Sequence, residues 1–216
     1  MTCSQCQGIE QEFDEKAAAK KLTSNHKNGP SKPTRLLINT LLGFGVEAST
    51  LLDIGGGIGT IQHALLNNGL DRSTSVDASS AYAEVAKKEA QNQGLSDRTE
   101  NIHGDFITLA PEVESADIVT LDKVICCYDD MHALVSASAA KAKKYYGLIF
   151  PNDTWWVKAA FNSINLIYAI TGNPFRGFVH STNQVEEILQ ANDFKRNYYS
   201  RSGFLGFWQV LVYSRI

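Results

Sequence analysis

Residues 51–60, Leu-Leu-Asp-Ile-Gly-Gly-Gly-Ile-Gly-Thr, constrain the fold of this chain more than any other segment. The apolar residues that precede Asp53 are typical of a buried strand that ends there. Gly55, Gly57 and Gly59 then allow a sharp turn and a close approach of the backbone to a ligand. An amphipathic helix is predicted directly after them, so its first amide groups would face whatever the loop holds.

The same loop indicates what kind of ligand it holds. A dinucleotide-binding loop requires Gly-x-Gly-x-x-Gly, but the sixth position is Thr60 when counted from Gly55 and Gln62 when counted from Gly57. In addition, Asp53 would repel a pyrophosphate, whereas it would attract a cationic or amine-bearing ligand. A nicotinamide-dependent oxidoreductase is therefore disfavoured.

Two further acidic residues follow predicted strands. Asp77 ends the β-rich run 73–77, and Asp105 follows the run 99–103. An acidic residue at the end of the second strand of such a sheet can accept hydrogen bonds from both ribose hydroxyls. Either residue alone could be a helix N-cap. Three acids after three successive strands, with Asp53 as the first, instead indicate one shared binding site.

This pattern resembles the cofactor site of the class I S-adenosylmethionine-dependent methyltransferases. The resemblance implies that Asp77 binds the ribose and that Asp105 binds the adenine amino group, with Phe106 against the ring. It also implies that the backbone at Leu121 and Asp122 holds the methionine end. The implied cofactor-binding residues are Asp53, Ile54, Gly55, Gly56, Gly57, Gly59, Asp77, Ala78, Gly104, Asp105, Phe106, Leu121 and Asp122.

The alternation of strands and helices predicts an α/β fold. Strands are expected near 50–54, 73–77, 99–103, 116–121 and 145–150, followed by a hairpin formed by 194–200 and 204–214. We therefore expect a Rossmann-like, seven-stranded, mostly parallel sheet with helices on both faces and a C-terminal antiparallel strand pair. Residues 1–48 would form an N-terminal helical cap on the methyltransferase domain 49–216, in which 152–182 would cover the substrate, all in one folded unit.

Composition excludes several classes of partner. The chain has 216 residues and a net charge of −3, so it offers no general basic surface for nucleic acid. The most apolar window, 155–171, contains a lysine and several polar residues and is not expected to span a membrane. No N-terminal signal pattern is evident, which predicts a cytoplasmic protein. The sequence leaves the oligomeric state open.

The substrate is expected beyond the carboxyl ends of the first and fourth strands. This rule places Asp122 and Tyr128 near the reacting methyl group, where Asp122 could also orient the substrate or accept its proton. Two adjacent tryptophans, Trp155 and Trp156, cannot both face one core, so one of them is predicted to contact the substrate. Arg176 could bind a carboxylate or phosphate of the same molecule.

Histidine is the usual base when a hydroxyl must lose its proton near neutral pH. His180 is the first candidate because Arg176 lies close to it in the sequence, and His132 is the second. A carboxylate acceptor would need no base. The predicted reaction is methyl transfer to an oxygen or nitrogen atom of a small amphipathic or aromatic metabolite. The alternative is a cofactor-binding or scaffolding protein of the same fold without catalysis.

Four cysteines raise the question of a metal site. Cys3, Cys6, Cys126 and Cys127 could together supply four thiolates. Adjacent cysteines are poor joint ligands for one tetrahedral ion, however, so neither a metal nor a disulfide is expected.

The chain has a weaker resemblance to the magnesium-protoporphyrin O-methyltransferases. It covers 121–128, 150–151 and 175–180, the last followed by an amphipathic helix at 185–189. Those enzymes have a histidine just before the tyrosine after the fourth strand, whereas this chain has Cys127 there. The porphyrin substrate is therefore not implied.

Overall fold

A seven-stranded sheet with the strand order β3-β2-β1-β4-β5-β7-β6 forms the centre of the protein. The structure, a computed structural model, describes residues 4–216, with side chains described from residue 7 onward. The strands are β1 (Thr50–Ile54), β2 (Arg72–Asp77), β3 (Thr99–His103), β4 (Ala116–Asp122), β5 (Ala142–Pro151), β6 (Phe194–Ser202) and β7 (Trp208–Arg215). β1 to β5 pair in parallel, and β7 pairs antiparallel with both β5 and β6. The expected Rossmann-like sheet with a C-terminal antiparallel pair is confirmed.

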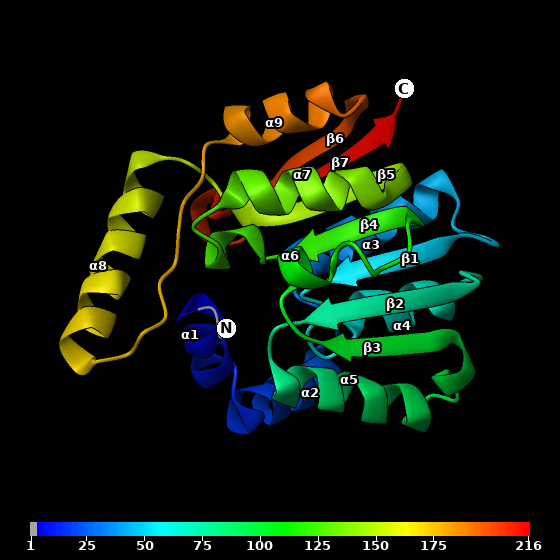
Figure 1. Ribbon diagram of the computed structural model, residues 1–216, viewed down its shortest axis with the longest axis horizontal. Coiled ribbons are helices and arrows are strands. Elements are labelled where there is room, and N and C mark those ends of the chain that lie inside the picture. Colours follow the sequence, from blue (N-terminus) through cyan, green and yellow to red (C-terminus); the bar gives the residue numbers. More distant parts are fainter. Residues whose placement is uncertain (1–3) are drawn as a thin grey trace.

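Helices cover both faces of this sheet (Figure 1). They are α1 (Ser4–Glu12), α2 (Glu15–Asn28), α3 (Lys32–Phe44), α4 (Thr60–Leu66), α5 (Ser80–Asn92), α6 (Phe106–Leu109), α7 (Met131–Lys141), α8 (Trp155–Thr171) and α9 (Thr182–Ala191). Apolar residues of α3 and α4 bury one face of the sheet, and those of α7 and α9 bury the other. Strands buried on both faces are rich in aliphatic residues rather than alternating, which is why β1 contributes both Leu51 and Leu52 to the core.

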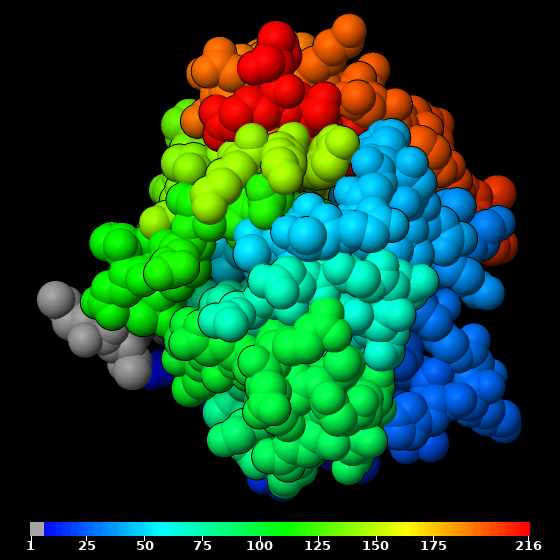
Figure 2. All heavy atoms as spheres, turned by 90° about the vertical axis from the view of Figure 1, so that its right-hand side faces the viewer, coloured from blue at the N-terminus to red at the C-terminus, as the bar shows by residue number. Residues whose placement is uncertain are grey.

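The N-terminal helices lie in two different environments. Leu37, Ile38 and Leu41 of α3 belong to the buried core under β5 and β7. α2 packs against α5, and α1 lies near the carboxyl ends of the parallel strands, toward which the arrowheads of β1 to β4 point (Figure 1). Figure 2 shows the opposite end of the molecule, where the parallel strands begin. The first helices therefore contribute both to the core and to the edge of the sheet where ligands are expected.

α8 stands apart from the sheet (Figure 1). Val157 is its one buried side chain, whereas Trp155, Leu166 and Ile170 are 81%, 62% and 77% exposed. The helix is tied to the rest by Tyr168, whose hydroxyl donates to Glu12 of α1 at 2.8 Å. None of the described helices is long and apolar enough to cross a membrane.

Candidate functional site

A cavity of about 210 Å³ lies at the carboxyl ends of β1, β2 and β4. Ile9 of α1 and Phe13 line its outer side, so the N-terminal segment covers it. Residues that the sequence predicted as cofactor contacts and that line this cavity are Asp53, Ile54, Gly55, Gly56, Gly57, Asp77, Ala78, Gly104, Phe106 and Asp122. We call this space the cofactor cavity. Gly59, Asp105 and Leu121 do not line it.

The glycine loop turns because three of its glycines adopt left-handed backbone angles. The φ angles of Gly55, Gly57 and Gly59 are 61°, 59° and 79°, a region that residues with a Cβ rarely enter. Asp77 holds this loop in place: its Oδ2 accepts the backbone N–H of Gly57 at 2.8 Å and its Oδ1 accepts that of Ser79 at 2.8 Å. The carboxylate expected to bind ribose therefore also ties the end of β2 to the loop after β1.

Asp53 is the most deeply buried acid of the site, with 1% of its surface exposed. Its Oδ1 accepts the hydroxyl of Thr120 at 2.7 Å. The pKa of Asp53 is raised to about 7, chiefly by burial and also by the carboxylates of Asp122 and Asp77, while the bond from Thr120 opposes this shift. A positive charge close to such an acid, as a cationic ligand in the cofactor cavity would bring, favours its ionised form.

Asp105 caps α6 rather than lining the cavity. Its carboxylate accepts the backbone N–H of Ile107 at 3.4 Å, the hydroxyl of Thr108 at 2.9 Å and the hydroxyl of Tyr128 at 2.6 Å. Tyr128 itself lines the cavity, so Asp105 contacts the site through this residue. The contact with the adenine amino group remains a prediction, and the geometry shows an N-cap.

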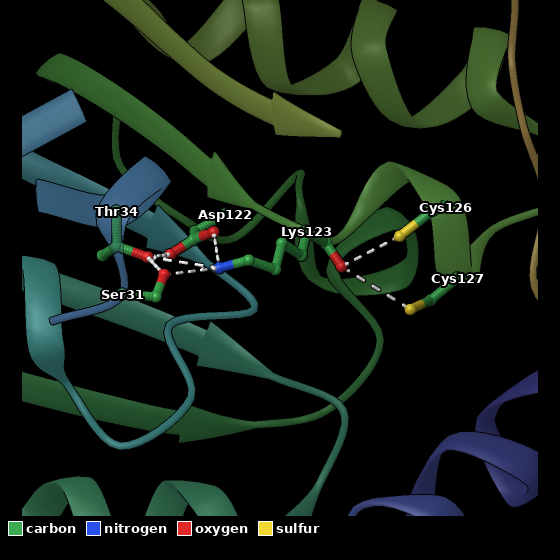
Figure 3. Close-up of polar contacts among 6 residues, drawn as sticks. All are labelled: Ser31, Thr34, Asp122, Lys123, Cys126 and Cys127. Carbon is green, nitrogen blue, oxygen red and sulfur yellow. Dashed lines mark hydrogen bonds and ion pairs between the residues drawn. The ribbon is translucent and has the colours of Figure 1, made fainter. Parts of the chain in front are cut away.

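Asp122 is held at the end of β4 by two donors (Figure 3). Thr34 of α3 donates its hydroxyl to Oδ2 at 2.6 Å, and the ammonium of Lys123 lies 2.7 Å from Oδ1. Lys123 also lies 3.2 Å from the Thr34 hydroxyl and 3.4 Å from that of Ser31. No pattern in the sequence pointed to Thr34 or Ser31, because polar residues at the start of a helix far away in the chain carry no pattern that links them to a strand end.

A second cavity, of about 280 Å³, lies beside the first. It is lined by α2, by the turn 29–31 and by the first turn of α3, and we call it the polar cavity. Lys21, Thr60 and Asp122 line both cavities. Asp122 therefore stands where the two cavities meet.

His180 and His132 line neither cavity. His180 Nε2 lies 2.7 Å from the carbonyl oxygen of Tyr128, to which it donates, and its ring stacks on Phe178 with centroids 5.9 Å apart. Burial lowers the pKa of His180, whereas its bonds to backbone carbonyls oppose this shift. His132 is exposed in the first turn of α7. A role for either histidine as the base remains a prediction without support from this placement.

The residues expected to bind the substrate also lie outside both cavities. Trp155 is exposed, and Trp156 packs edge to face against Phe207 with centroids 5.7 Å apart. The guanidinium of Arg176 donates to the carbonyl oxygens of Asn173 at 2.5 Å and Phe175 at 2.6 Å. Arg176 thus stabilises the turn after α8 in this structure.

Two cysteines lie beside the cofactor cavity. The thiols of Cys126 and Cys127 are 3.2 and 3.6 Å from the carbonyl oxygen of Lys123 (Figure 3). The expectation about Cys3 and Cys6 falls outside what is described, because Cys3 and the Cys6 side chain are not part of it. Within the described part of the chain, no three potential metal ligands come together.

Comparisons with protein families and with solved structures both find methyltransferases. Residues 52–144 match the family described as "Methyltransferase domain". No curated protein matches the chain. Among solved structures, magnesium protoporphyrin IX methyltransferase from Synechocystis PCC 6803 with bound SAH is similar, with 18% identity, coverage of 85% of this chain and 82% of that one, and a TM-score of 0.69. The same enzyme with bound SAM is also similar.

Two further structures show how widely the fold is used. Mitomycin 7-O-methyltransferase has 21% identity, covers 95% of this chain and 60% of its own, and has a TM-score of 0.65. A cyclase has 14% identity, covers 84% of this chain and 80% of its own, and has a TM-score of 0.63. The matched family segment contains the glycine loop together with Asp77 and Asp122. Residues 52–144 therefore match a methyltransferase domain, and the whole chain has the fold of methyltransferases that are crystallised with SAM or SAH.

Proposed function

We propose that this methyltransferase methylates an oxygen atom of a small amphipathic or aromatic metabolite. The observation that carries the proposal is the position of Asp122 between the cofactor cavity and the polar cavity. An acceptor in the polar cavity would reach the cofactor past this carboxylate. Several of the similar structures are O-methyltransferases by their titles, which supports oxygen as the acceptor atom.

The cofactor cavity has features that suit S-adenosylmethionine. The backbone of Gly57 faces it without a Cβ, which would otherwise project to 3.5 Å from the ring of Tyr82. Asp53, Asp77 and Asp122 line it, and their negative charges complement a ligand that carries a sulfonium and an ammonium group. When bound, the cofactor supplies an already activated methyl group, so the protein has mainly to position the acceptor.

Asp122 is suited to position a hydroxyl group. A carboxylate offers about four lone-pair directions, and those used by Thr34 and Lys123 leave others for an acceptor. The two bonds also fix the orientation of the carboxylate, which reduces the conformational freedom lost when the acceptor binds. Asp122 would therefore orient the attacking oxygen and take its proton, while His180 would support the loop at Tyr128.

The test combines binding with turnover. Calorimetry should give micromolar affinity for S-adenosylmethionine and S-adenosylhomocysteine and no measurable affinity for nicotinamide dinucleotides. A methyl-transfer screen over hydroxylated metabolites should then find an acceptor. Asp122→Asn removes one of the three negative charges of the cofactor cavity and should weaken cofactor binding only modestly, but at saturating cofactor it should reduce turnover by about two orders of magnitude, the usual effect of losing a proton acceptor. Full turnover by Asp122→Asn would contradict the role of this residue.

The alternative is a protein that binds the cofactor without transferring its methyl group. The similarity to a cyclase supports this alternative, because a protein of the same fold is described there as a cyclase and not as a methyltransferase. Cofactor binding without methyl transfer to any acceptor in the screen would support it.

A further inference from the structure

Positive side chains gather around the polar cavity. Lys21 of α2 and both Lys32 and Arg35 of α3 line it, and Asp122 is the one acidic residue among its lining residues. The other lining side chains that can form hydrogen bonds are neutral, among them Ser24, Asn25 and Asn28. Because the whole chain carries a net charge of −3, this excess of positive charge is local.

Within the described part of the protein the three cations form no direct ion pair, although the carboxylate of Asp122 attracts Lys21 at longer range. No hydrogen bond or ion pair joins the side chain of Lys21, Lys32 or Arg35 to another described residue, whereas Asp122 already pairs with Lys123 at 2.7 Å. Partial burial lowers the pKa of Lys21, and the positive charge of Lys123 lowers it further, although Asp122 opposes both. Unpaired cations that share one cavity favour an anion there.

The N-terminus of α3 also favours an anion in the polar cavity. Ser31 is the N-cap of the helix but makes no side-chain capping bond, because its hydroxyl lies 2.7 Å from that of Thr34 instead. The N-terminus of a helix carries a partial positive charge that favours anions. The cavity lies against this helix end, since Ser31, Lys32 and Thr34 all line it.

We propose that the polar cavity binds an anionic group of the methyl acceptor, a carboxylate or a phosphate, and so places the neutral reacting hydroxyl beside Asp122. This inference rests on the proposed function and names the substrate class. The cavity, of about 280 Å³, has more space than a single carboxylate fills. The acceptor is therefore a small hydroxylated acid or phosphate ester, and the cations of α2 and α3 take the role that the sequence suggested for Arg176.

The first experiment measures anion binding in the presence of saturating S-adenosylhomocysteine. Benzoate and inorganic phosphate are the probes, and benzamide is the uncharged control. At least one of the two anions should raise the melting temperature of the natural protein, and benzamide should not.

The Lys32→Ala/Arg35→Ala double variant should lose about ten-fold or more of this anion affinity, and Arg35→Lys should retain part of it. Lys20→Ala, an exposed residue of α2 that lines neither cavity, is the matched control and should bind as the natural protein does. The absence of stabilisation by both anions would overturn the proposal.

The second experiment distinguishes the acceptor from the cofactor as the source of the anion. S-adenosylhomocysteine carries a carboxylate, and methylthioadenosine does not. The double variant should bind both with affinities within about two-fold of the natural protein. If it loses about ten-fold for S-adenosylhomocysteine alone, the cavity holds the methionine end of the cofactor and the proposal is wrong. Failure of the proposed function has a different signature, because anion binding would then be intact while no hydroxylated acid or phosphate ester accepts a methyl group.

Discussion

The carboxylate of Asp77 accepts the backbone N–H of Gly57 at 2.8 Å, so the end of β2 holds the glycine loop that follows β1. A residue expected only to bind the ribose therefore also shapes the loop under it. Burial raises the pKa of Asp77, but the bonds from Ser79 and Gly57 favour the ionised form that the loop needs.

Replacing Asp77 should consequently affect both binding and stability. Asp77→Ala removes two loop bonds, together with the two bonds that it is expected to form with the ribose, and bonds to a charged group are worth about 1.5–3 kcal/mol each. Cofactor affinity should fall by at least about ten-fold, as measured by calorimetry. The melting temperature of the unliganded protein should also fall, which a role in ribose binding alone does not predict. Asp77→Asn, which keeps one acceptor oxygen, should show a smaller change in melting temperature.

The ionisation of Asp53 should make cofactor binding depend on pH. Because the pKa of Asp53 in the folded protein is raised to about 7, the protonated form is favoured by folding. Its contribution to stability is thus complete below about pH 4 and is lost as the pH rises through about 7. A cationic cofactor favours the ionised form, so affinity for S-adenosylmethionine should increase from pH 6 to pH 8, by at most about ten-fold per unit.

Asp53→Asn tests this assignment directly. The variant should show a flat affinity profile between pH 6 and pH 8, and calorimetry in buffers of different ionisation enthalpy should detect no proton release. An unchanged pH dependence in Asp53→Asn would assign the titration to another group.

The bond from Thr34 to Asp122 should matter for turnover more than for cofactor binding. Thr34→Val removes the hydroxyl that lies 2.6 Å from Oδ2 and leaves the carboxylate free to rotate. The rate of methyl transfer should fall by about ten-fold, consistent with one bond to a charged group, while the affinity for S-adenosylhomocysteine stays the same. Thr40→Val on the same helix is the control, because the Thr40 hydroxyl donates to the carbonyl of Leu36 and lies in neither cavity. Equal losses in both variants would indicate a general effect on α3.

His180 should contribute to stability rather than to proton transfer. His180→Ala removes the bond to the Tyr128 carbonyl at 2.7 Å and the stacking on Phe178, which should cost about 1–2 kcal/mol of the free energy of unfolding. Turnover should fall by less than the factor of about one hundred that a lost base produces. His132→Ala, at an exposed position, provides the comparison. A hundred-fold loss without loss of stability would restore His180 as the base.

The sheet could be predicted from the sequence because its signals are local. β1 and β4 are short, mainly apolar runs, and the glycine loop after Asp53 fixes where the first strand ends. The carboxyl ends of parallel strands meet at one edge, so placing Asp53, Asp77 and Asp122 in one cavity required only the strand order.

The polar cavity could not be predicted in this way. Lys21, Thr34 and Arg35 lie on helices that precede the first strand, and nothing in their spacing tells which strand end they approach. The exposure of Trp155, at 81%, agrees with the expectation that two adjacent tryptophans cannot both face one core, but neither tryptophan lines a cavity, so their contact with a substrate stays a prediction. The hydrogen bond from the Tyr128 hydroxyl to Asp105 could not be predicted either, because it joins two loops whose residues are 23 positions apart in the chain.

The position of β7 has a consequence for the order in which the protein can assemble. Trp208–Arg215 lies between β5 and β6, so β6 has no neighbour in the sheet until these later residues arrive. During synthesis the ribosome would release the parallel half, including the strands that surround the cofactor cavity, well before β6 can dock. Completion of the sheet then depends on the last strand entering between two earlier ones. Since β6 pairs with β7 alone, we expect this edge of the sheet to close after the edge that holds the cofactor cavity.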